Sequence, residues 1–543
     1  MSFKSFESQK DSFNEQDESL PYFGTWKNLP HINLLAIFAH LEVRELLSCS
    51  HVCRRWNDIS KNNTLWKRLF LNDFHYKRGR MKTTSNYIHN SNQDWKRRYL
   101  KNIYTVPRIS VEVLKVHDDE VLHVSFSNDS LYFVTCSKDC KAIIWRTKDL
   151  EIDEIHNMSK YGWMFTWASK FSPSDKRLLI SGVVDEIGGE IVVMERSKEY
   201  PHNFQKLCRV MNDPYDVVGC WWSDRYFISG TIKSSSNDQF QASIWLCEPR
   251  GSDTIYNESI DEEMSHNESL ISINLYKYCL FKYKSLYISY LRNLLCVCLS
   301  QMKNVISSVP IESEGAINES IDPNVLKLFK NESDEYVLVF MCSDLTSIPH
   351  KIGFYKLTPD RFSFTPVITS PDAAVELNGH TVGLNLSKDG RYLYVSLRSW
   401  PENSLVSAFE LPAISSEIET KVIDMKTLTL VEDLTFFGHK AFTPSHQAYY
   451  LYLDTSESFI TSGSENSKGI IWERSSGIKL SELKHDACVN SVAFYPNDEE
   501  RCISISDDGT IKVWESLNRY KSSSNYDELK MKELYTQAIH HKF

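Results

Sequence analysis

Residues 117–145, HDDEVLHVSFSNDSLYFVTCSKDCKAIIW, and residues 485–514, HDACVNSVAFYPNDEERCISISDDGTIKVW, are built to one plan. An aspartate follows the first histidine by 22 residues in one stretch and by 23 in the other, and a tryptophan follows that aspartate by six in both. Between these landmarks, alternating apolar runs are separated by Asn-Asp or Asp-Asp turns, a pattern typical of short antiparallel strands. The sequence therefore contains an internal repeat of strand-rich units.

Weaker units lie between these two stretches. They begin near residues 161, 213, 271, 380 and 439, which predicts seven units in all. The last unit has only three strands, whereas residues 110–114 form an additional strand before the first unit. We expect this strand to complete the last unit, because the chain then closes without an open sheet edge.

The two strong units resemble WD repeats, in which each unit is a four-stranded blade of a β-propeller. The resemblance implies hydrogen bonds across a blade among a His, a Ser or Thr, an Asp and a Trp. The matching residues are His117, Ser137, Asp139 and Trp145 in the first unit and His485, Ser506, Asp508 and Trp514 in the last. The sixth unit keeps His439 and Trp472, but Asn466 takes the place of the aspartate. We expect all these residues to be structural rather than catalytic or metal-bound.

Residues 29–74 predict a small helical domain. Leu34, Ile37, Phe38 and Leu41 are spaced as the apolar stripe of an amphipathic helix, and shorter patterns predict two or three further helices. So few helices bury little surface on their own, so we expect another chain to cover an apolar face.

The order and spacing of the apolar residues in this domain resemble an F-box. The matching residues are Leu29, Pro30, Leu34, Ile37, Phe38, Leu41, Leu46, Leu47, Val52, Cys53, Trp56, Leu65 and Trp66. The resemblance implies binding to the adaptor subunit of SCF-type cullin-RING ubiquitin ligases, with Trp56 and Trp66 as large anchors in a groove of the adaptor. The alternative is an unrelated small helical bundle.

Four further stretches resemble the F-box/WD repeat-containing protein 5 family: residues 121–145, 212–221, 387–401 and 462–477. That family implies a substrate receptor for SCF ligases that can also engage the DNA-damage-binding adaptor of cullin-four ligases. The second partnership is associated with a Trp-Asp-x-Arg box. The nearest piece here is Trp472-Glu473-Arg474, in which Glu replaces Asp and Arg falls one place early.

The expected fold class is α+β multidomain, with a small all-α F-box domain followed by an all-β seven-bladed WD-repeat propeller. The predicted segments are a disordered tail at 1–28, the F-box at 29–74, a basic helical linker at 75–107, the propeller at 108–518 with insertions near 249–270 and 301–335, and a tail at 519–543. In the interrupted fourth unit, strands are predicted at 286–290, 336–342 and 352–357.

Composition excludes several classes of protein. The 543 residues are 42% hydrophobic and 24% charged, which is ordinary for a globular protein and excludes wholesale disorder. No apolar run approaches the roughly 18 residues of a membrane span, and the N-terminus lacks the apolar core of a signal peptide. We therefore expect the chain in the cytoplasm, or also in the nucleus, with its thirteen cysteines as thiols.

Charge is unevenly distributed. Residues 53–108 carry +11, whereas the 435 residues outside 1–108 carry −18. The basic segment favours either a solvated helix face or, as a competing hypothesis, a nucleic-acid-binding patch. The acidic body suggests substrates with basic segments.

The sequence contains no phosphate-binding GxxxxGK[ST] loop, no HExxH, no GxSxG and no paired CxxC. We therefore predict a non-catalytic substrate-recognition subunit without cofactor or metal, which would act by proximity, and we keep a non-degradative WD-repeat scaffold as the alternative. Loops on the narrow face of a propeller are the usual place for a protein substrate. By position, the candidate substrate-binding residues are His123, Lys138, Glu465, Asn490 and Asp507. Each of them could equally be a solvated polar residue.

Overall fold

A computed structural model describes residues 26, 29–74, 94–184, 188–198, 203–212, 219–234, 240–249, 275–285, 292–298, 316–320, 336–343, 348–357, 364–368, 371–401, 404, 412–444 and 450–522. The chain divides into two compact units, one made of Met1–His75 with Asn92–Leu100 and the other of Tyr76–Ser91 with Lys101–Phe543. We call them the helical unit and the propeller unit.

Four short helices make most of the helical unit: α2 (His31–Phe38), α3 (Val43–Cys49), α4 (Arg54–Ser60) and α5 (Asn63–Asp73). Hydrogen bonds cap the N-termini of two of these helices. At the start of α3 the Glu42 N–H donates to Glu45 Oε2 (2.9 Å), and at the start of α5 the Asn62 side chain accepts from the Thr64 N–H (2.9 Å). Helix α7 (Trp95–Tyr104) contributes residues to both units. The prediction of helices in the N-terminal region is confirmed.

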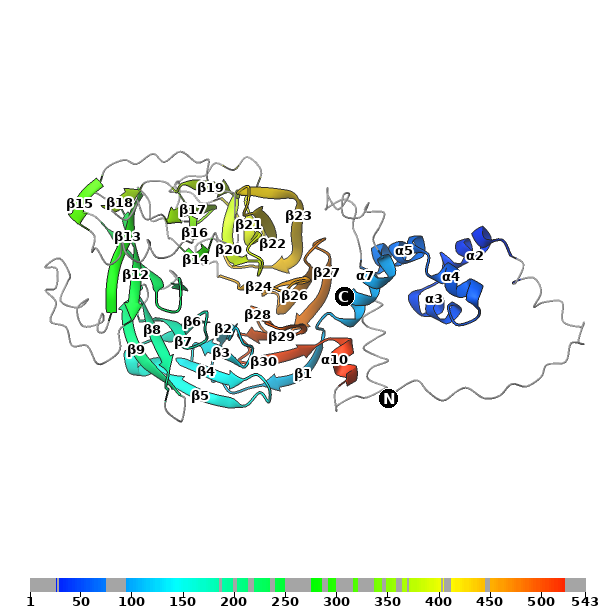
Figure 1. The fold of residues 1–543 in the computed structure, drawn as a ribbon, viewed down its shortest axis with the longest axis horizontal. Helices are drawn as coiled ribbons and strands as arrows, with labels where there is room; N and C mark the ends of the chain where they lie inside the picture. Colours follow the sequence, from blue (N-terminus) through cyan, green and yellow to red (C-terminus); the bar gives the residue numbers. More distant parts are fainter. Residues whose placement is uncertain are drawn as a thin grey trace, which may run out of the picture. The chain divides into compact units, whose positions relative to one another are not determined.

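The propeller unit contains seven sheets, most of them four-stranded and antiparallel, that follow one another round a ring (Figure 1). The first two blades are β2 (Val121–Phe126), β3 (Tyr132–Ser137), β4 (Lys141–Arg146) and β5 (Ile152–Asn157), then β6 (Phe165–Phe171), β7 (Arg177–Val183), β8 (Gly189–Arg196) and β9 (Phe204–Met211). A short 3-10 helix, η1 (Met158–Tyr161), joins them.

The third blade is the exceptional one, because two later strands extend it to six. It contains β10 (Cys220–Trp221), β11 (Phe227–Ser234), β12 (Phe240–Pro249), β13 (Leu275–Ser285), β18 (Phe364–Ile368) and β15 (Ala316–Ser320). The fourth contains β14 (Arg292–Cys298), β16 (Tyr336–Cys342), β17 (Lys351–Leu357) and β19 (Ala373–Glu376). Two of the strands predicted in the fourth unit are thus confirmed, and the third, at 286–290, lies outside the described residues.

The remaining blades are regular. The fifth contains β20 (Gly379–Leu386), β21 (Tyr392–Ser399), β22 (Glu417–Asp424) and β23 (Thr429–Lys440). The sixth contains β24 (Leu453–Thr455), β25 (Phe459–Ser462), β26 (Lys468–Glu473) and β27 (Lys479–Lys484). The seventh contains β28 (Val489–Tyr495), β29 (Asp498–Ser506), β30 (Ile511–Glu515) and β1 (Ile109–Leu114).

Strand β1 closes the ring as predicted. It pairs antiparallel with β30, with Ser110 opposite Trp514 and Leu114 opposite Ile511. The Arg108 N–H extends the pairing by donating to the Glu515 carbonyl (3.0 Å). Because the first strand of the unit completes the last blade, no sheet edge is left open at the junction of the two chain ends.

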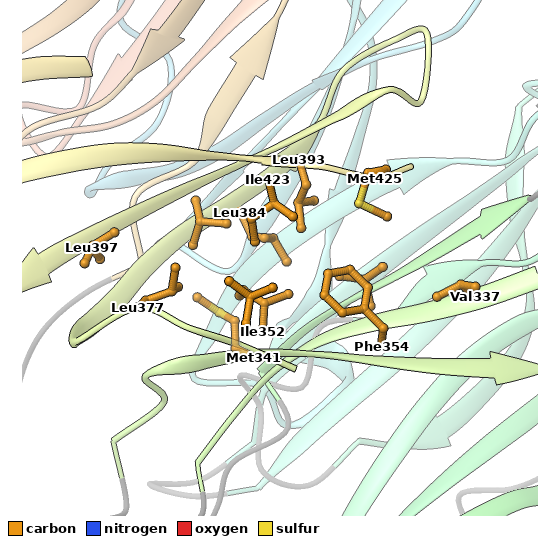
Figure 2. Packing of buried hydrophobic residues seen from close by; sticks show 13 residues of the cluster. Val337, Met341, Ile352, Phe354, Leu377, Leu384, Leu393, Leu397, Ile423 and Met425 are labelled. Atoms are coloured by element: carbon orange, nitrogen blue, oxygen red, sulfur yellow. The ribbon is translucent and has the colours of Figure 1, made fainter. Parts of the chain in front are cut away.

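Apolar side chains fill the spaces between neighbouring blades. Figure 2 shows the cluster between the fourth and fifth blades, in which Met341 and Ile352 from one blade lie against Leu384 and Leu393 from the other. These side chains are almost fully buried, and each contributes about 1.5–3 kcal/mol when removed from water. Both faces of a blade are thus covered at its inner strands, and β7 and β8 are accordingly almost completely buried.

The structure adds detail at two of the predicted segments. Helix α10 (Leu517–Ser522) crosses the predicted end of the propeller at residue 518, and its Leu517 and Tyr520, three residues apart, are both buried. The predicted insertion near 301–335 contains β15, which pairs with β18. The tails at 1–25 and 523–543, most of the first insertion and the linker residues 75–93 lie outside the described residues.

Candidate functional site

The helical unit buries much of the apolar set that resembles an F-box. Leu34, Phe38, Leu46, Leu65 and Trp66 are at most 2% exposed. The Trp66 Nε1–H donates to the Ser60 carbonyl (2.7 Å), and its ring lies edge-on to Tyr99 with centroids 5.5 Å apart. Trp66 is therefore a core residue and not an anchor for a partner, because no part of its ring is accessible.

A second group of apolar residues of the same unit is exposed. Ile32 is 71% exposed, Val52 62% and Ile37 38%, and Pro30 and Cys53 are exposed as well. Ile32 was not among the predicted residues. Its position on α2 could have indicated it, because it lies two residues from the buried Leu34 and hence on the opposite side of the helix.

The remaining predicted residues of the F-box are partly buried: Leu29, Leu41, Leu47 and Trp56. Trp56 packs edge-on against Phe38, with ring centroids 5.4 Å apart, and keeps part of its surface accessible. Of the two predicted anchors, only Trp56 is thus available to a partner.

The cations of the basic segment pack against the helices of their own unit. The Arg98 guanidinium lies over the Phe70 and Trp95 rings (4.6 and 5.1 Å), and the Lys96 ammonium lies over Trp66 (5.4 Å). Arg68 donates to the Leu41 carbonyl (2.7 Å). These three cations stabilise aromatic faces and carbonyls, so within the described part of the basic segment they contribute to the packing of the helical unit.

In the propeller unit, the expected hydrogen-bond network exists in the first and seventh blades. His117 Nδ1 lies 2.9 Å from Asp139 Oδ2, and its Nε2 lies 2.8 Å from Thr135 Oγ1, which also accepts from Trp145 Nε1 (3.0 Å). The seventh blade repeats this arrangement with His485, Asp508, Ser504 and Trp514.

The assignment of Ser137 and Ser506 to these networks was wrong. The hydroxyl between His and Trp belongs to Thr135 and to Ser504, two residues earlier on the strand. Ser137 instead accepts from the Asp139 N–H (3.1 Å), and Ser506 from the Asp508 N–H (3.2 Å). Residues two apart share a face of a strand, so both hydroxyls face the same way but only the deeper one reaches the indole.

The carboxylates of the two networks are held ionised. Although burial opposes the charge of Asp508, hydrogen bonds from Thr510 and from backbone N–H groups lower its pKa to about 2. Burial lowers the pKa of His485 to about 4. A neutral imidazole beside an ionised carboxylate suits a hydrogen bond that orients a loop, and it supports the structural role that was expected.

The sixth blade lacks this network, in keeping with Asn466 at the aspartate position. Neither ring nitrogen of His439 has a hydrogen-bond partner among the described residues, and the ring lies edge-on to Trp472 at 5.0 Å. Trp472 Nε1 donates to the Phe437 carbonyl instead (2.8 Å). Burial lowers the pKa of His439 to about 3.

The candidate substrate-binding residues do not form one site. We call the end of the blades where His117 meets Asp139 the narrow face. There Lys138 pairs with Glu120, and the Asn490 side chain joins the seventh blade to the first by donating to Asp507 Oδ1 (2.6 Å) and to the Val121 carbonyl (2.8 Å). Burial, reinforced by the charge of Glu120, raises the pKa of Asp507.

Glu465 and His123 have other surroundings. Glu465, in the turn between β25 and β26, accepts from the N–H groups of Phe442 (2.6 Å) and Thr443 (3.0 Å) and so holds the loop that follows β23. Its charge, together with those of Asp507 and Glu120, acts on the Cys488 thiol, whose pKa is raised first by burial and then by these acids. His123 lines an internal cavity of the propeller unit. The narrow face is therefore acidic around Cys488, with Lys138 as a nearby cation.

The piece that resembles a Trp-Asp-x-Arg box is engaged inside the propeller unit. Arg474 donates to the Tyr394 hydroxyl (2.9 Å) and to Asp389 Oδ2 (3.0 Å), which ties the sixth blade to the fifth. It lines a groove of about 500 Å³ together with Tyr392 and Lys101. Trp472 is fully buried.

Other kinds of site were searched for in the described part of the chain. No group of three or more His, Cys, Asp or Glu side chains there is placed to hold a metal ion. None of the helices described is long and apolar enough to cross a membrane.

Comparisons with known proteins match both units. The F-box-like family model matches residues 26–72, and the model named WD domain, G-beta repeat matches residues 108–146 and 477–515. F-box/WD repeat-containing protein 5 of Mus musculus is 30% identical over 565 aligned residues, which cover 90% of this chain and 93% of that protein. The human protein of the same name is 29% identical, with 90% of this chain and 94% of that protein covered. With an F-box unit of buried and exposed apolar faces and a closed seven-bladed propeller, the chain belongs to the F-box/WD repeat-containing protein 5 family.

Proposed function

We propose that this chain is the substrate-recognition subunit of an SCF-type cullin-RING ubiquitin ligase. In this role the helical unit docks on the adaptor and the propeller unit binds the protein to be ubiquitinated. The observation that carries the proposal is the exposure of Ile32, Ile37 and Val52 on a unit whose core is formed by other apolar residues, such as Leu34, Phe38 and Trp66.

Burial of the exposed apolar residues in a complex would favour docking. Side chains such as Ile32 and Val52 gain about 25 cal/mol for each Å² of apolar surface removed from water, and a few such residues carry most of the energy of an interface. Pro30 precedes α2, where its fixed φ suits the start of a helix. The adaptor would therefore meet α2 and the turn between α3 and α4.

The propeller unit supplies a rigid platform for a protein substrate. Its loops at the narrow face are held by the His117 and His485 networks and by Glu465. Acidic side chains there favour substrates with Lys or Arg residues, through steering more than through specific affinity. Ubiquitin transfer would then be promoted by proximity, with no group of this chain in the chemistry.

The SCF adaptor is favoured over the cullin-four adaptor for a physical reason. Arg474 already satisfies Tyr394 and Asp389, so a partner that needs this guanidinium would have to break two hydrogen bonds of the propeller.

We propose the cytoplasm, or also the nucleus, as the place of action, which fluorescence microscopy of a tagged chain would test.

The experiment is an affinity purification of the unmodified full-length chain and two variants of it, with quantification of adaptors and cullins by mass spectrometry. The docking variant carries Ile32→Asp and Val52→Asp, and the matched control carries Ile155→Asp, an exposed apolar residue of the propeller unit (52%). Changes at Leu34 or Phe38 are avoided because both are core residues and their loss would unfold the unit.

We expect the docking variant to lose the SCF adaptor and its cullin by at least about tenfold, since two apolar anchors are replaced by charges. The control should retain both. Equal recovery of the SCF adaptor by all three chains would refute the proposal. Adaptor binding without ubiquitination of any captured protein would favour a non-degradative scaffold, and recovery of only the cullin-four adaptor would move the ligase contact to the propeller.

A further inference from the structure

A cavity of about 360 Å³ lies among the first strands of the propeller blades. Strands β2, β6, β20, β24 and β28 line it, with His123, Ser169, Asn385, Asp454 and Ser491 among the polar residues. Lys170 and Lys388 also line the cavity and are exposed, so it communicates with solvent at their end. The cavity takes no part in the proposed adaptor contact.

Several hydrogen-bond donors that line this cavity have no acceptor among the described residues. The Tyr452 hydroxyl and the Ser181 hydroxyl are buried without a partner. His123 Nδ1 accepts from the Ser169 N–H (3.3 Å), so in the neutral ring the proton must be on Nε2, which becomes a further donor. Burial, with the nearby charge of Lys170, lowers the pKa of His123 to about 3 and keeps the ring neutral.

His123 and Tyr452 lie close to each other, and Lys170 and Ser181 line the same cavity from strands β6 and β7 of the second blade. The rings of His123 and Tyr452 are in contact, with centroids 4.3 Å apart. Ser169 bonds both to His123 and to Ser125 (Oγ to Oγ, 2.9 Å), and Ser181 lies opposite Ala168 in the register of the second blade. Lys170 follows Ser169 directly, and no hydrogen bond or ion pair of its ammonium group occurs in the described part of the chain.

Two other polar groups of the cavity, the Asp454 carboxylate and the Tyr450 hydroxyl, already have partners in the protein. Asp454 accepts from the Phe494 and Thr455 N–H groups (both 2.7 Å), and burial raises its pKa to about 6. The Tyr450 hydroxyl bonds to both the N–H and the carbonyl of Leu384 (2.9 Å each). The cavity thus offers the Lys170 ammonium, the His123 Nε2–H and the hydroxyls of Tyr452 and Ser181, each of which can donate a hydrogen bond, while its carboxylate is bound by the protein.

The Lys170 ammonium and the His123 Nε2–H can only donate hydrogen bonds, and a hydroxyl can rotate to donate as well, so these groups together favour a ligand that accepts hydrogen bonds. An oxyanion does so, and its bonds to an ammonium or hydroxyl are about twice as strong as neutral ones. We propose that the cavity is a binding site for a small oxyanion, a phosphate or carboxylate group, held by Lys170, His123 Nε2–H and the hydroxyls of Tyr452 and Ser181. The alternative occupant is ordered water, which buried hydroxyl groups commonly bind.

The test is isothermal titration calorimetry of the full chain at pH 7 and constant ionic strength, with sodium phosphate in one series and sodium succinate in the other. Lys170→Met removes the ammonium, and Tyr452→Phe removes one hydroxyl while keeping the ring. Lys148→Met is the matched control, because Lys148 is exposed in the turn between β4 and β5 and does not line the cavity.

We expect saturable binding of one anion per chain, weakened about tenfold by Lys170→Met and several-fold by Tyr452→Phe, and unchanged by Lys148→Met. Binding of phosphate alone would identify a phosphate site, and binding of both probes a general oxyanion site. Two results would overturn the proposal: no saturable heat with either probe, or equal weakening by Lys170→Met and Lys148→Met. Equal melting temperatures of the variants would show that they are folded, so absence of binding would be informative.

Discussion

The seventh and sixth blades place a histidine and a tryptophan at corresponding positions but satisfy them differently. In the seventh blade, His485 bonds to Asp508 (3.0 Å) and Ser504 (2.7 Å), and Ser504 accepts from Trp514 Nε1 (2.7 Å). In the sixth blade, His439 has no such partner in the described chain, and aromatic contact with Trp472 takes its place. The blade fold therefore does not require the network, since apolar packing between blades is sufficient to hold it.

In the second blade, the tryptophan indole has a third kind of hydrogen-bond partner. It has no histidine of this kind, and the buried Glu190 accepts from Trp163 Nε1 (2.6 Å) and from Arg209 Nη2 (2.8 Å). Arg209 also lies over the Tyr161 ring (4.6 Å). A buried ion pair thus holds the loop that leads into this blade. Variants in the three blades can therefore test the His network, the aromatic contact and the ion pair separately.

The largest effect is expected from breaking the ion pair of the second blade. Arg209→Met leaves the Glu190 carboxylate, whose side chain is 2% exposed, without its cation. We expect a loss of about 3–5 kcal/mol of unfolding free energy in urea. Arg177→Met is the control in the same blade, because its partner Glu195 is 43% exposed and the pair should contribute less than about 1 kcal/mol. Similar losses of unfolding free energy in both variants would contradict the larger contribution expected of the buried Glu190 pair.

The unpartnered histidine of the sixth blade predicts a pH effect. Its folded pKa is about 3, whereas an unfolded histidine has a pKa of about 6.5. Between these values the unfolded chain binds a proton that the folded chain does not, so stability falls as pH falls. Between pH 6 and pH 4, the wild-type chain should lose about 2.5 kcal/mol more than His439→Phe. Parallel stability curves for the two chains in urea titrations would contradict this expectation.

Replacing the histidine by phenylalanine in the seventh and in the sixth blade compares the hydrogen-bond network with the aromatic contact directly. His485→Phe removes two buried hydrogen bonds and should destabilise the chain by about 2 kcal/mol at pH 7. His439→Phe removes none and should be neutral, or stabilise by up to about 1 kcal/mol, because an unpaired buried polar group is replaced by an apolar one. Thermal melting of both variants checks the order. If His439→Phe proved the more harmful, then His439 would have a polar partner.

The smallest effect is expected at the rim of the first blade. Lys141 pairs with Asp118, whose side chain is 79% exposed, and with the more buried Asp139 (3.4 Å). Because the first pair is solvated, Lys141→Ala should change the unfolding free energy by no more than about 1 kcal/mol. A loss comparable to that of His485→Phe would show that Lys141 belongs to the His117 network.

The apolar stripe predicted for α2 shows where sequence reasoning reached its limit. Spacing identified Leu34, Ile37 and Phe38 as one stripe, yet Leu34 and Phe38 are in the core and Ile37 is 38% exposed. Periodicity reports which residues share a side of a helix, but a stripe is wider than the face that a neighbouring helix covers. Only the packing of α2 against α4 separates the residues that hold the unit from those that a partner could cover.

The number of blades, the closing strand and the helical character of the first domain could be predicted from the sequence, because they depend on periodicity and on turn residues that act locally. The tertiary structure alone decided which hydroxyl completes each network, where Thr135 and not Ser137 reaches Trp145. It also decided that Arg474 is engaged within the propeller and that Trp66 is inaccessible. Such outcomes depend on distances between side chains in the folded chain, which local sequence patterns do not determine.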